Sequence, residues 1–250
     1  MSTIRRAAQL LAGRTRILVF TGAGISTESG IPDFRGPNGV WTRVDPNEFT
    51  INRYLANPET RRRSWRTRAE SGVLEARPND AHRAVVDLWR AGRMIGCVTQ
   101  NIDGLHQRAG LPGGDVVELH GNAHRTVCVA CGARMATSAA LERVVAGDDD
   151  PACRDCGGIL KTDVVFFGEM LPDGATERAF DLATRCDAVL AVGSTLSVYP
   201  AAYVPMEALK TGSHLVIVNQ GPTEMDDLAT VRIEGPAGTV LPDLVAAVTA

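Results

Sequence analysis

Two pairs of cysteines have the spacing of a metal-binding site. Each pair has the form Cys-x-x-Cys with a glycine after it, and the residues are Cys128, Cys131, Cys153 and Cys156. Four thiolates in a tetrahedral array form a closed structural zinc site, which leaves no open position for a substrate. The alternative is two redox-active or unrelated cysteine pairs. We expect one structural zinc ion at this site.

A glycine turn follows the first apolar run of the chain. Residues 17–20 have the character of a buried strand, and Gly22, Ala23 and Gly24 come shortly after them. Glycines at this place let the backbone approach a phosphate, and N–H groups at a helix start can hold an anion. We therefore expect a nucleotide site. The third glycine of the dinucleotide fingerprint is replaced by Thr27, which argues against hydride transfer.

The loop after the glycine turn combines side chains of different chemistry. Asp33, Phe34 and Arg35 supply an acid, an aromatic ring and a guanidinium in succession. This combination is unusual for an enzyme that transfers a hydride, and we expect the loop to be mobile.

Polar residues also follow three later apolar runs. Ligands of parallel sheets bind at the carboxyl ends of the strands, so these residues are candidates for the same nucleotide site as the glycine turn. They are Gln100, Asn101 and Asp103 after the second run, Gly193 and Ser194 after a later one, and Asn219 and Gln220 after the next.

The elements that must position these residues form an alternating pattern. Apolar strands alternate with helices, which predicts an α/β fold with a Rossmann-like parallel sheet and helices on both faces. The predicted strands span residues 16–21, 94–99, 116–119, 188–192, 215–218 and 231–233. The predicted helices span residues 2–13, 58–70, 81–91, 175–186, 201–211 and 238–249, with a short one near 47–56.

Length and charge limit the class of protein. A chain of 250 residues can bury one substantial core and one small satellite. The net charge of -3 gives no general attraction to nucleic acid or to an anionic membrane. No apolar run approaches the ~20 residues of a membrane helix, and the N-terminus lacks a signal peptide. We expect a cytoplasmic monomer that binds neither nucleic acid nor membrane directly.

Several motifs run through nearly the whole chain in a characteristic order. On these motifs the chain resembles the sirtuin family of the bacterial type, the NAD-dependent protein-lysine deacylases. The family has Gly-Thr-Ser where this chain has Gly193, Ser194 and Thr195, and both side chains remain hydroxyls. The matching stretches are residues 22–36, 99–106, 120–121, both Cys-x-x-Cys pairs, 167–172, 193–198 and 218–219.

The resemblance implies two domains with a cleft between them for NAD and acyl-lysine. Residues 1–35, 75–121 and 163–250 would form a discontinuous Rossmann-like NAD-binding domain. Residues 36–74 would form the helical part of a small domain, and residues 122–162 its zinc-binding part.

The resemblance also assigns roles around NAD, which is consumed as a co-substrate. The glycine turn would approach the diphosphate, Gly193 and Ser194 would form a second cradle, and Asn219 and Gln220 would lie at the adenosine ribose. The loop with Asp33 and Arg35 would close over the cofactor, and Gln100 would lie beside it.

Four residues are implied to act near the reacting carbon. Asn101 would position the ribose, Asp103 would recognise the nicotinamide amide, and Phe34 would exclude water. His120 would be the general base, for which an imidazole of pKa ~6.5 is suited. The alternatives are a structural role for His120 and a helix cap for Asp103. We expect His82 and His106 to be structural.

The substrate side is implied by one stretch that resembles the family's peptide-binding strand. In this family a strand pairs with the backbone of the acyl-lysine protein or peptide, which is recognition by strand addition. The corresponding residues are Val165, Phe166, Phe167 and Gly168.

The acyl group is left open by the sequence. The branch that removes succinyl, malonyl and glutaryl groups carries Tyr-x-x-Arg, and Trp65 and Arg68 have that spacing here. Arg68 could bind an acyl carboxylate in bidentate fashion. The alternative is a solvated basic helix face.

Three other functions compete with deacylation. The first is a mono-ADP-ribosyltransferase, which also cleaves NAD, and the others are a zinc-ribbon binding module and an NAD dehydrogenase. The expected products of deacylation are nicotinamide, free lysine and O-acyl-ADP-ribose.

Overall fold

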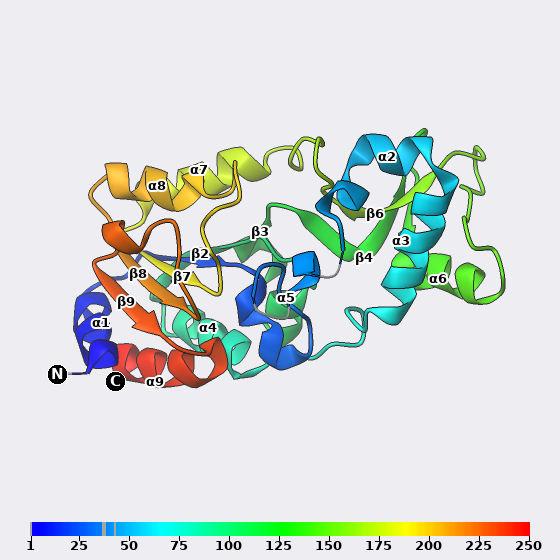
Figure 1. The fold of residues 1–250 in the computed structure, drawn as a ribbon. Helices are drawn as coiled ribbons and strands as arrows, with labels where there is room; N and C mark the ends of the chain where they lie inside the picture. The colour runs from blue at the N-terminus through cyan, green and yellow to red at the C-terminus, as the bar shows by residue number, and fades with distance from the viewer. Residues whose placement is uncertain (1, 37–38, 43) are drawn as a thin grey trace.

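The structure is a computed structural model that describes residues 2–36, 39–42 and 44–250. A parallel sheet with its helices occupies one end of the molecule, and a smaller sheet with further helices occupies the other (Figure 1). Among the described residues, no helix is both long and apolar enough to span a bilayer.

The large sheet has six strands, and every neighbouring pair in it is parallel. Strands β1 and β7 in its centre are buried along their whole length, as expected when helices cover both faces. All six predicted strands are therefore confirmed. In spatial order they are β3 (Val116–Glu118), β2 (Met94–Thr99), β1 (Ile17–Thr21), β7 (Ala188–Val192), β8 (His214–Asn219) and β9 (Val231–Glu234).

Helices pack on both faces of this sheet (Figure 1). One face is covered by α1 (Thr3–Ala12), α4 (Asp80–Arg90) and α9 (Ala237–Thr249), with the short α5 (Leu105–Ala109) beside α4. The other face is covered by α7 (Ala175–Arg185) and α8 (Tyr203–Lys210). The prediction of helices on two faces is confirmed.

The start of α4 places a histidine close to the strand ends. Asn79 is the N-cap, and its side-chain oxygen accepts hydrogen bonds from the amides of Ala81 and His82. The His82 ring accepts in return from the Asn79 amide, which completes a capping box. His82 is fully buried, so this cap fixes an imidazole inside the protein.

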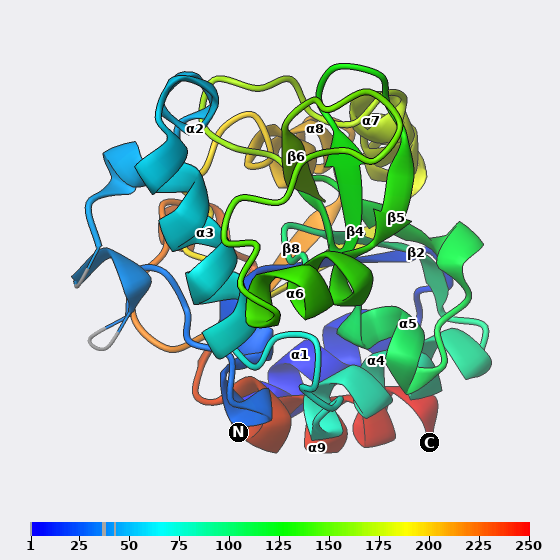
Figure 2. The same ribbon diagram turned by 90° about the vertical axis from the view of Figure 1, so that its right-hand side faces the viewer.

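The second sheet is antiparallel and carries the cysteine pairs. Its spatial order is β5 (Arg134–Ala136), β4 (Gly121–Cys128) and β6 (Leu160–Val164), and α6 (Thr137–Val145) packs against β4. The helices α2 (Ile51–Ala56) and α3 (Pro58–Glu70) lie at the same end of the molecule (Figure 2). Strands β4 and β5 and helix α6 were not predicted from the sequence.

The stretch predicted to bind the peptide directly follows strand β6. Strand β6 ends at Val164, and residues 165–168 continue without a ladder. Phe167 forms only an isolated bridge with Thr50. The apolar run therefore marks the end of β6 and an irregular segment after it.

Candidate active site at the carboxyl edge of the parallel sheet

The ends of the central strands meet through short hydrogen bonds. The Gln100 side chain, after β2, donates to Ser194 Oγ, after β7, at 2.8 Å. The Gly24 amide, after β1, donates to the Gly193 carbonyl at 2.8 Å. The structure therefore brings three of the predicted polar strand ends together at one edge of the sheet.

The glycines allow two backbone turns to touch. A Cβ atom on Gly22 would lie 2.8 Å from the Gly193 oxygen, and one on Gly24 would lie 2.7 Å from the Gly193 Cα. The amides of both glycines donate to backbone carbonyls, of Val192 and of Gly193. The two glycine N–H groups are thus engaged within the protein. The close approach of two loops requires the glycines, and contact of this turn with a phosphate stays a prediction.

A buried cluster of three side chains forms the centre of this edge. The Ser26 hydroxyl donates to Asp103 Oδ2 at 2.7 Å and accepts from Asn101 Nδ2 at 3.2 Å. All three residues are at most 8 % exposed. Asp103 Oδ1 accepts from the Leu105 amide at 2.9 Å, so the carboxylate also holds the start of α5. Both interpretations of Asp103, polar site residue and helix cap, are compatible with this geometry.

His120 lies two residues after the end of β3 and is half-buried. Its Nδ1 is 2.9 Å from the Gln100 carbonyl. A carbonyl only accepts, so Nδ1 carries the proton and Nε2 has the lone pair. Burial lowers the pKa of the imidazole, against a smaller opposing effect of that hydrogen bond. A neutral ring with its basic nitrogen fixed can act as a general base near pH 7.

The loop with the predicted closing residues lies beside this edge. Asp33 Oδ1 accepts from the Gly36 amide at 2.9 Å, and the Asp33 carbonyl accepts from Val40. Phe34 is 38 % exposed, and Arg35 is exposed. Asp33 thus shapes the turn, and the Phe34 side chain is partly accessible to solvent.

The turn after β8 is held by its own side chain. Asn219 Nδ2 donates to the carbonyls of Gln220 and Gly221 at 3.1 and 3.0 Å, and Asn219 is 7 % exposed. Gln220 is exposed. Asn219 therefore shapes the strand end, and Gln220 is the side chain that a ligand can reach.

Trp65 and Arg68 lie in different environments. Trp65 is 1 % exposed and packs with Cys128, Cys153 and Leu160 beneath the cysteine pairs. The Trp65 ring therefore belongs to the core around the cysteines, and recognition of an acyl group by Trp65 and Arg68 stays a prediction. Arg68 is half-buried, burial lowers its pKa, and it forms no salt bridge within the described part of the chain.

The segment after β6 is fixed to its surroundings. The Val165 amide donates to the His120 carbonyl at 2.9 Å, so the segment passes directly beside that residue. The Phe167 amide donates to Phe49, and the Phe167 carbonyl accepts from Ile51. A peptide would have to pair with backbone groups on either side of Phe167.

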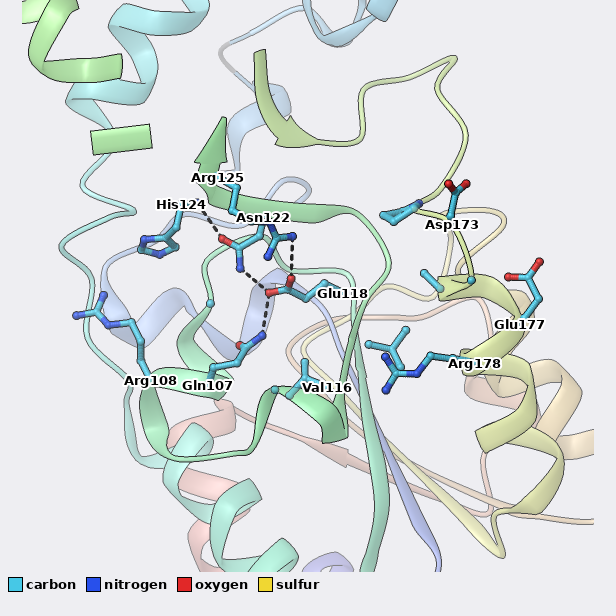
Figure 3. A pocket seen from close by; sticks show the side chains of 16 residues that line it. Gln107, Arg108, Val116, Glu118, Asn122, His124, Arg125, Asp173, Glu177 and Arg178 are labelled. Carbon is cyan, nitrogen blue, oxygen red and sulfur yellow. Dashed lines mark hydrogen bonds and ion pairs between the residues drawn. The ribbon is translucent and has the colours of Figure 1, made fainter. Parts of the chain in front are cut away.

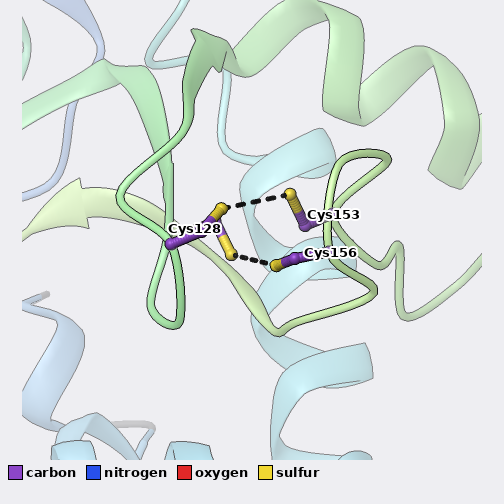
Figure 4. A group of neighbouring side chains, drawn as sticks. Cys128, Cys153 and Cys156 are labelled. Atoms are coloured by element: carbon purple, nitrogen blue, oxygen red, sulfur yellow. Dashed lines mark hydrogen bonds between the residues drawn. The ribbon is translucent and has the colours of Figure 1, made fainter.

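The four cysteines form a compact group at the other end of the molecule (Figure 4). Their sulfur atoms lie within 4.8 Å of one another, with Cys128 to Cys156 at 3.5 Å and Cys131 to Cys153 at 3.8 Å. Tetrahedral zinc with bonds of about 2.3 Å requires sulfur atoms about 3.8 Å apart. The residues present fit one structural zinc ion.

A hollow of about 840 Å³ opens beside the strand ends (Figure 3). Glu118 in its lining accepts from Gln107 at 2.8 Å and from Arg125 at 3.2 Å. Its wall touches the site where His124 Nε2 bonds to the Asp103 carbonyl at 2.9 Å. None of the predicted cofactor residues lines this hollow.

Three residues of the central edge received no role from the sequence. Ser26 lies within a recognised motif, and a hydroxyl directly after the glycine turn is the signal that could have found it. Thr21 and Thr99 are the last residues of β1 and β2 and face each other in the strand register. Their hydroxyls bond at 2.8 Å, but strand register cannot be obtained from one sequence.

Comparison with known proteins points to one family. The model of the Sir2 family matches residues 22–200. The chain is 48% identical over 236 residues to the NAD-dependent protein deacetylase 2 of Streptomyces coelicolor, covering 94% of this chain and 98% of that protein. It is 43% identical over 242 residues to the NAD-dependent protein deacetylase 1 of Bradyrhizobium diazoefficiens, covering 96% and 94%.

Solved structures agree with these relatives. A Sir2 structure with a deacetylated p53 peptide and 3'-O-acetyl ADP ribose matches with a TM-score of 0.91 and 37% identity, covering 97% of both chains. A second, described in terms of the mechanism and regulation of Sir2 enzymes, matches with a TM-score of 0.90 and 44% identity, covering 98% of this chain and 97% of the other.

Proposed function

This chain belongs to the Sir2 family, and on that premise we propose that it removes acyl groups from lysine side chains of proteins at the expense of NAD. The products are nicotinamide, deacylated lysine and O-acyl-ADP-ribose. The observation that carries this proposal is the buried cluster of Ser26, Asn101 and Asp103 beside a neutral His120. Relatives named deacetylases and deacylases support it.

NAD lies across the carboxyl edge of the parallel sheet in this proposal. Its diphosphate approaches Gly22, Ala23 and Gly24 on one side and Gly193 and Ser194 on the other. Since the glycine amides are engaged, contact with the phosphates falls to other groups of these turns.

The ends of β2 and β8 hold the two riboses and the nicotinamide. Gln220 and the turn shaped by Asn219 lie at the adenosine ribose. Asn101 orients the second ribose, Asp103 binds the nicotinamide amide, and Gln100 braces the neighbouring turn through its bond to Ser194. When bound, NAD supplies a ribose carbon that accepts the acyl oxygen as nicotinamide leaves.

His120 then removes a proton from a ribose hydroxyl. Its Nδ1 is held by the Gln100 carbonyl, so Nε2 is the nitrogen that takes the proton. The ring must be neutral for this step, and its lowered pKa favours the neutral form at pH 7. Phe34, on the loop with Asp33 and Arg35, covers the reacting carbon and excludes water.

The acyl-lysine peptide binds beside Val165, Phe166, Phe167 and Gly168. This segment adjoins His120 through the bond from the Val165 amide, and Phe167 is 48% exposed. We assign residues 1–35, 75–121 and 163–250 to the NAD-binding domain, and residues 36–74 and 122–162 to the small domain. We propose a cytoplasmic monomer whose partners are acylated proteins rather than nucleic acid or membrane.

Acetyl groups are the proposed substrate, with one observation in favour of acidic acyl groups. Arg68 lacks a carboxylate partner in the described structure, so an acyl carboxylate could supply one. The buried position of Trp65 counts against a Tyr-x-x-Arg type of pocket.

A panel of acetyl-, succinyl- and long-acyl-lysine peptides tests the proposal when NAD-dependent loss of the acyl mass is followed. We expect deacetylation by the parent protein and its loss in His120→Ala. If Arg68 binds an acyl carboxylate, Arg68→Met reduces desuccinylation far more than deacetylation. Equal rates for the parent and His120→Ala would overturn the role of His120, and ADP-ribose on protein with the acyl group retained would favour the ADP-ribosyltransferase.

A further inference from the structure

A second buried histidine lies next to the loop that carries the proposed site residues Asn101 and Asp103. His106 is 1% exposed and belongs to α5, which starts directly after the loop that carries Asn101 and Asp103. Its Nε2 lies 2.9 Å from Thr21 Oγ1. The ring is therefore attached to the end of β1, on the interior side of the site.

A chain of hydroxyl groups leads from this ring to Asn101. The Thr21 hydroxyl donates to Thr99 Oγ1 at 2.8 Å, and Thr99 Oγ1 accepts from the backbone N–H of Asn101 at 3.0 Å. Thr21 has only one hydroxyl proton, which goes to Thr99. Thr21 must therefore accept from His106, which places the imidazole proton on Nε2.

The other ring nitrogen supports the same tautomer. His106 Nδ1 is buried and has no hydrogen-bond partner in the described structure. Buried N–H groups without an acceptor are rare, and leaving one unpaired costs about 1–3 kcal/mol. A bare lone pair on Nδ1 and a proton on Nε2 is the arrangement that avoids this. Burial also lowers the pKa of His106 to about 4, which keeps the ring neutral.

Asn101 is thereby held at two points. Its backbone N–H is fixed by the hydroxyls of Thr99 and Thr21. Its side chain donates to Ser26, which in turn donates to Asp103. A loop held only by its side chain could rotate about the backbone, and small displacements of a reacting group can lower a rate by about 100-fold.

We propose that His106 is a positioning residue, which as a neutral Nε2–H imidazole fixes the Asn101 backbone through the hydroxyls of Thr21 and Thr99. The inference rests on the proposed function, because it assigns Asn101 to the reacting ribose. It goes beyond that function by connecting a residue that touches no substrate to the rate of the chemical step.

We call the hydrogen-bonded series from His106 through Thr21 and Thr99 to Asn101 the relay. Four variants test it through deacetylation kinetics. His106→Leu and Thr21→Val remove a link, and His106→Gln and Thr21→Ser retain a donor or a hydroxyl at similar positions. We expect the first pair to lower kcat at least about tenfold with little change in the KM for acetyl peptide. We expect the second pair to recover most of the loss.

Coupling between the links separates a relay from two independent defects. The double variant His106→Leu/Thr21→Val should be no slower than either single variant, because each substitution alone already interrupts the relay. His214→Gln, at the opposite end of β8, is the matched histidine control and should keep the parent kcat. Equal losses in His106→Leu and His106→Gln, or a change in KM alone, would overturn the proposal.

A spectroscopic measurement keeps this test apart from the proposed function. In protein with 15N-labelled histidine, we expect NMR to show His106 as the Nε2–H tautomer at pH 5 in the parent and in His214→Gln. An Nδ1–H or doubly protonated ring would overturn the relay even if the enzyme deacetylates. The expected tautomer in a parent that does not deacetylate would instead count against the proposed function.

Discussion

The two ends of the molecule are held together by different kinds of interaction. At the carboxyl edge of the parallel sheet, mostly neutral hydroxyl, amide and imidazole groups bond to one another around the single carboxylate of Asp103. At the other end, four cysteine sulfur atoms lie in a region that also holds ion pairs, such as the partly buried pair of Arg61 and Asp150 at 2.8 Å.

This difference separates a preorganised site from a region that depends on charge. The strand ends are set by the backbone of a buried sheet, and the side chains of Ser26, Asn101 and Asp103 are hydrogen-bonded to one another before any ligand binds. The zinc-binding end has a small core and relies on a metal and on ion pairs between α3 and residues 148–150. We expect perturbations of charge and metal to act on the second region first.

Loss of a cysteine ligand should have the largest effect. Cys153→Ser leaves three thiolates, and because structural zinc contributes about 10–16 kcal/mol to folding, we expect the region around β4 to β6 to unfold. Zinc content by metal analysis should fall below one ion per chain. The rate of deacylation should fall more than about 100-fold.

The matched control is a cysteine outside the zinc site. Cys186 bonds to the Ala183 carbonyl and the Ser213 hydroxyl, far along the chain from both pairs. Cys186→Ser should keep one zinc ion and the parent activity. A Cys153→Ser protein with full zinc content would show that the four cysteines do not share one ion.

Mild acid should have the next largest effect and should act on the sheet end. Burial, with contributions from His106 and Arg83, lowers the pKa of His82 to about 2, and burial lowers that of His106 to about 4. Both rings are then neutral in the folded protein, whereas the unfolded chain binds protons below its pKa of about 6.5. Stability therefore falls as pH decreases from about 6.5.

The size of this loss follows from proton linkage. Each histidine contributes up to about 1.4 kcal/mol per pH unit once its unfolded form is fully protonated, and at pH 6.5 that form is only half protonated. The free energy of unfolding should therefore be about 3 kcal/mol lower at pH 5 than at pH 6.5. Denaturant unfolding at the two pH values measures this loss. His106→Gln should remove about half of the pH dependence of the free energy of unfolding. A stability that is flat over this range would mean that these rings are not buried as neutral imidazoles.

The smallest effect is expected where a single ion pair supports the segment that we propose to bind the peptide. Lys161 is 5% exposed, and its Nζ donates to the Val164 carbonyl and to Glu169 Oε2 at 2.6 and 2.9 Å. Glu169 also accepts from the Phe166 amide at 2.7 Å. Lys161→Met should raise the KM for acetyl peptide about tenfold, with little change in kcat.

Lys161→Arg is the control for this pair, because it keeps a cation at the same place. Its KM for acetyl peptide should lie between those of the parent and Lys161→Met, since a guanidinium differs in shape from an ammonium. A fall in kcat at unchanged KM would show that the ion pair acts on the reacting groups rather than on the peptide segment.

The sequence predicts the sheet end far better than the zinc-binding end for a physical reason. Strands buried on both faces form continuous apolar runs that are visible in one sequence, as in β1 and β7. Strand β5 has only three residues and α6 only nine, and most of their residues are exposed or half-buried. Short elements of this kind lack a clear pattern, so only the cysteines marked the region.

Within the site, residue types were predicted more reliably than contacts. Spacing places Trp65 and Arg68 on one face of α3, but packing decides that Trp65 lies beneath the cysteines. Likewise, glycines after a strand suggest a phosphate turn, whereas their amides bond to the neighbouring turn. The hydroxyl pair of Thr21 and Thr99 depends on strand register, which emerges only in the fold.

The most direct test of the account follows the acyl group itself. An acetyl-lysine peptide carrying a 13C-labelled acetyl group is incubated with NAD and the parent protein, and all products are measured by mass spectrometry. We expect equal amounts of nicotinamide, deacetylated peptide and ADP-ribose that bears the labelled acetyl group. Labelled free acetate formed without NAD, or ADP-ribose attached to protein while the peptide keeps its label, would contradict it.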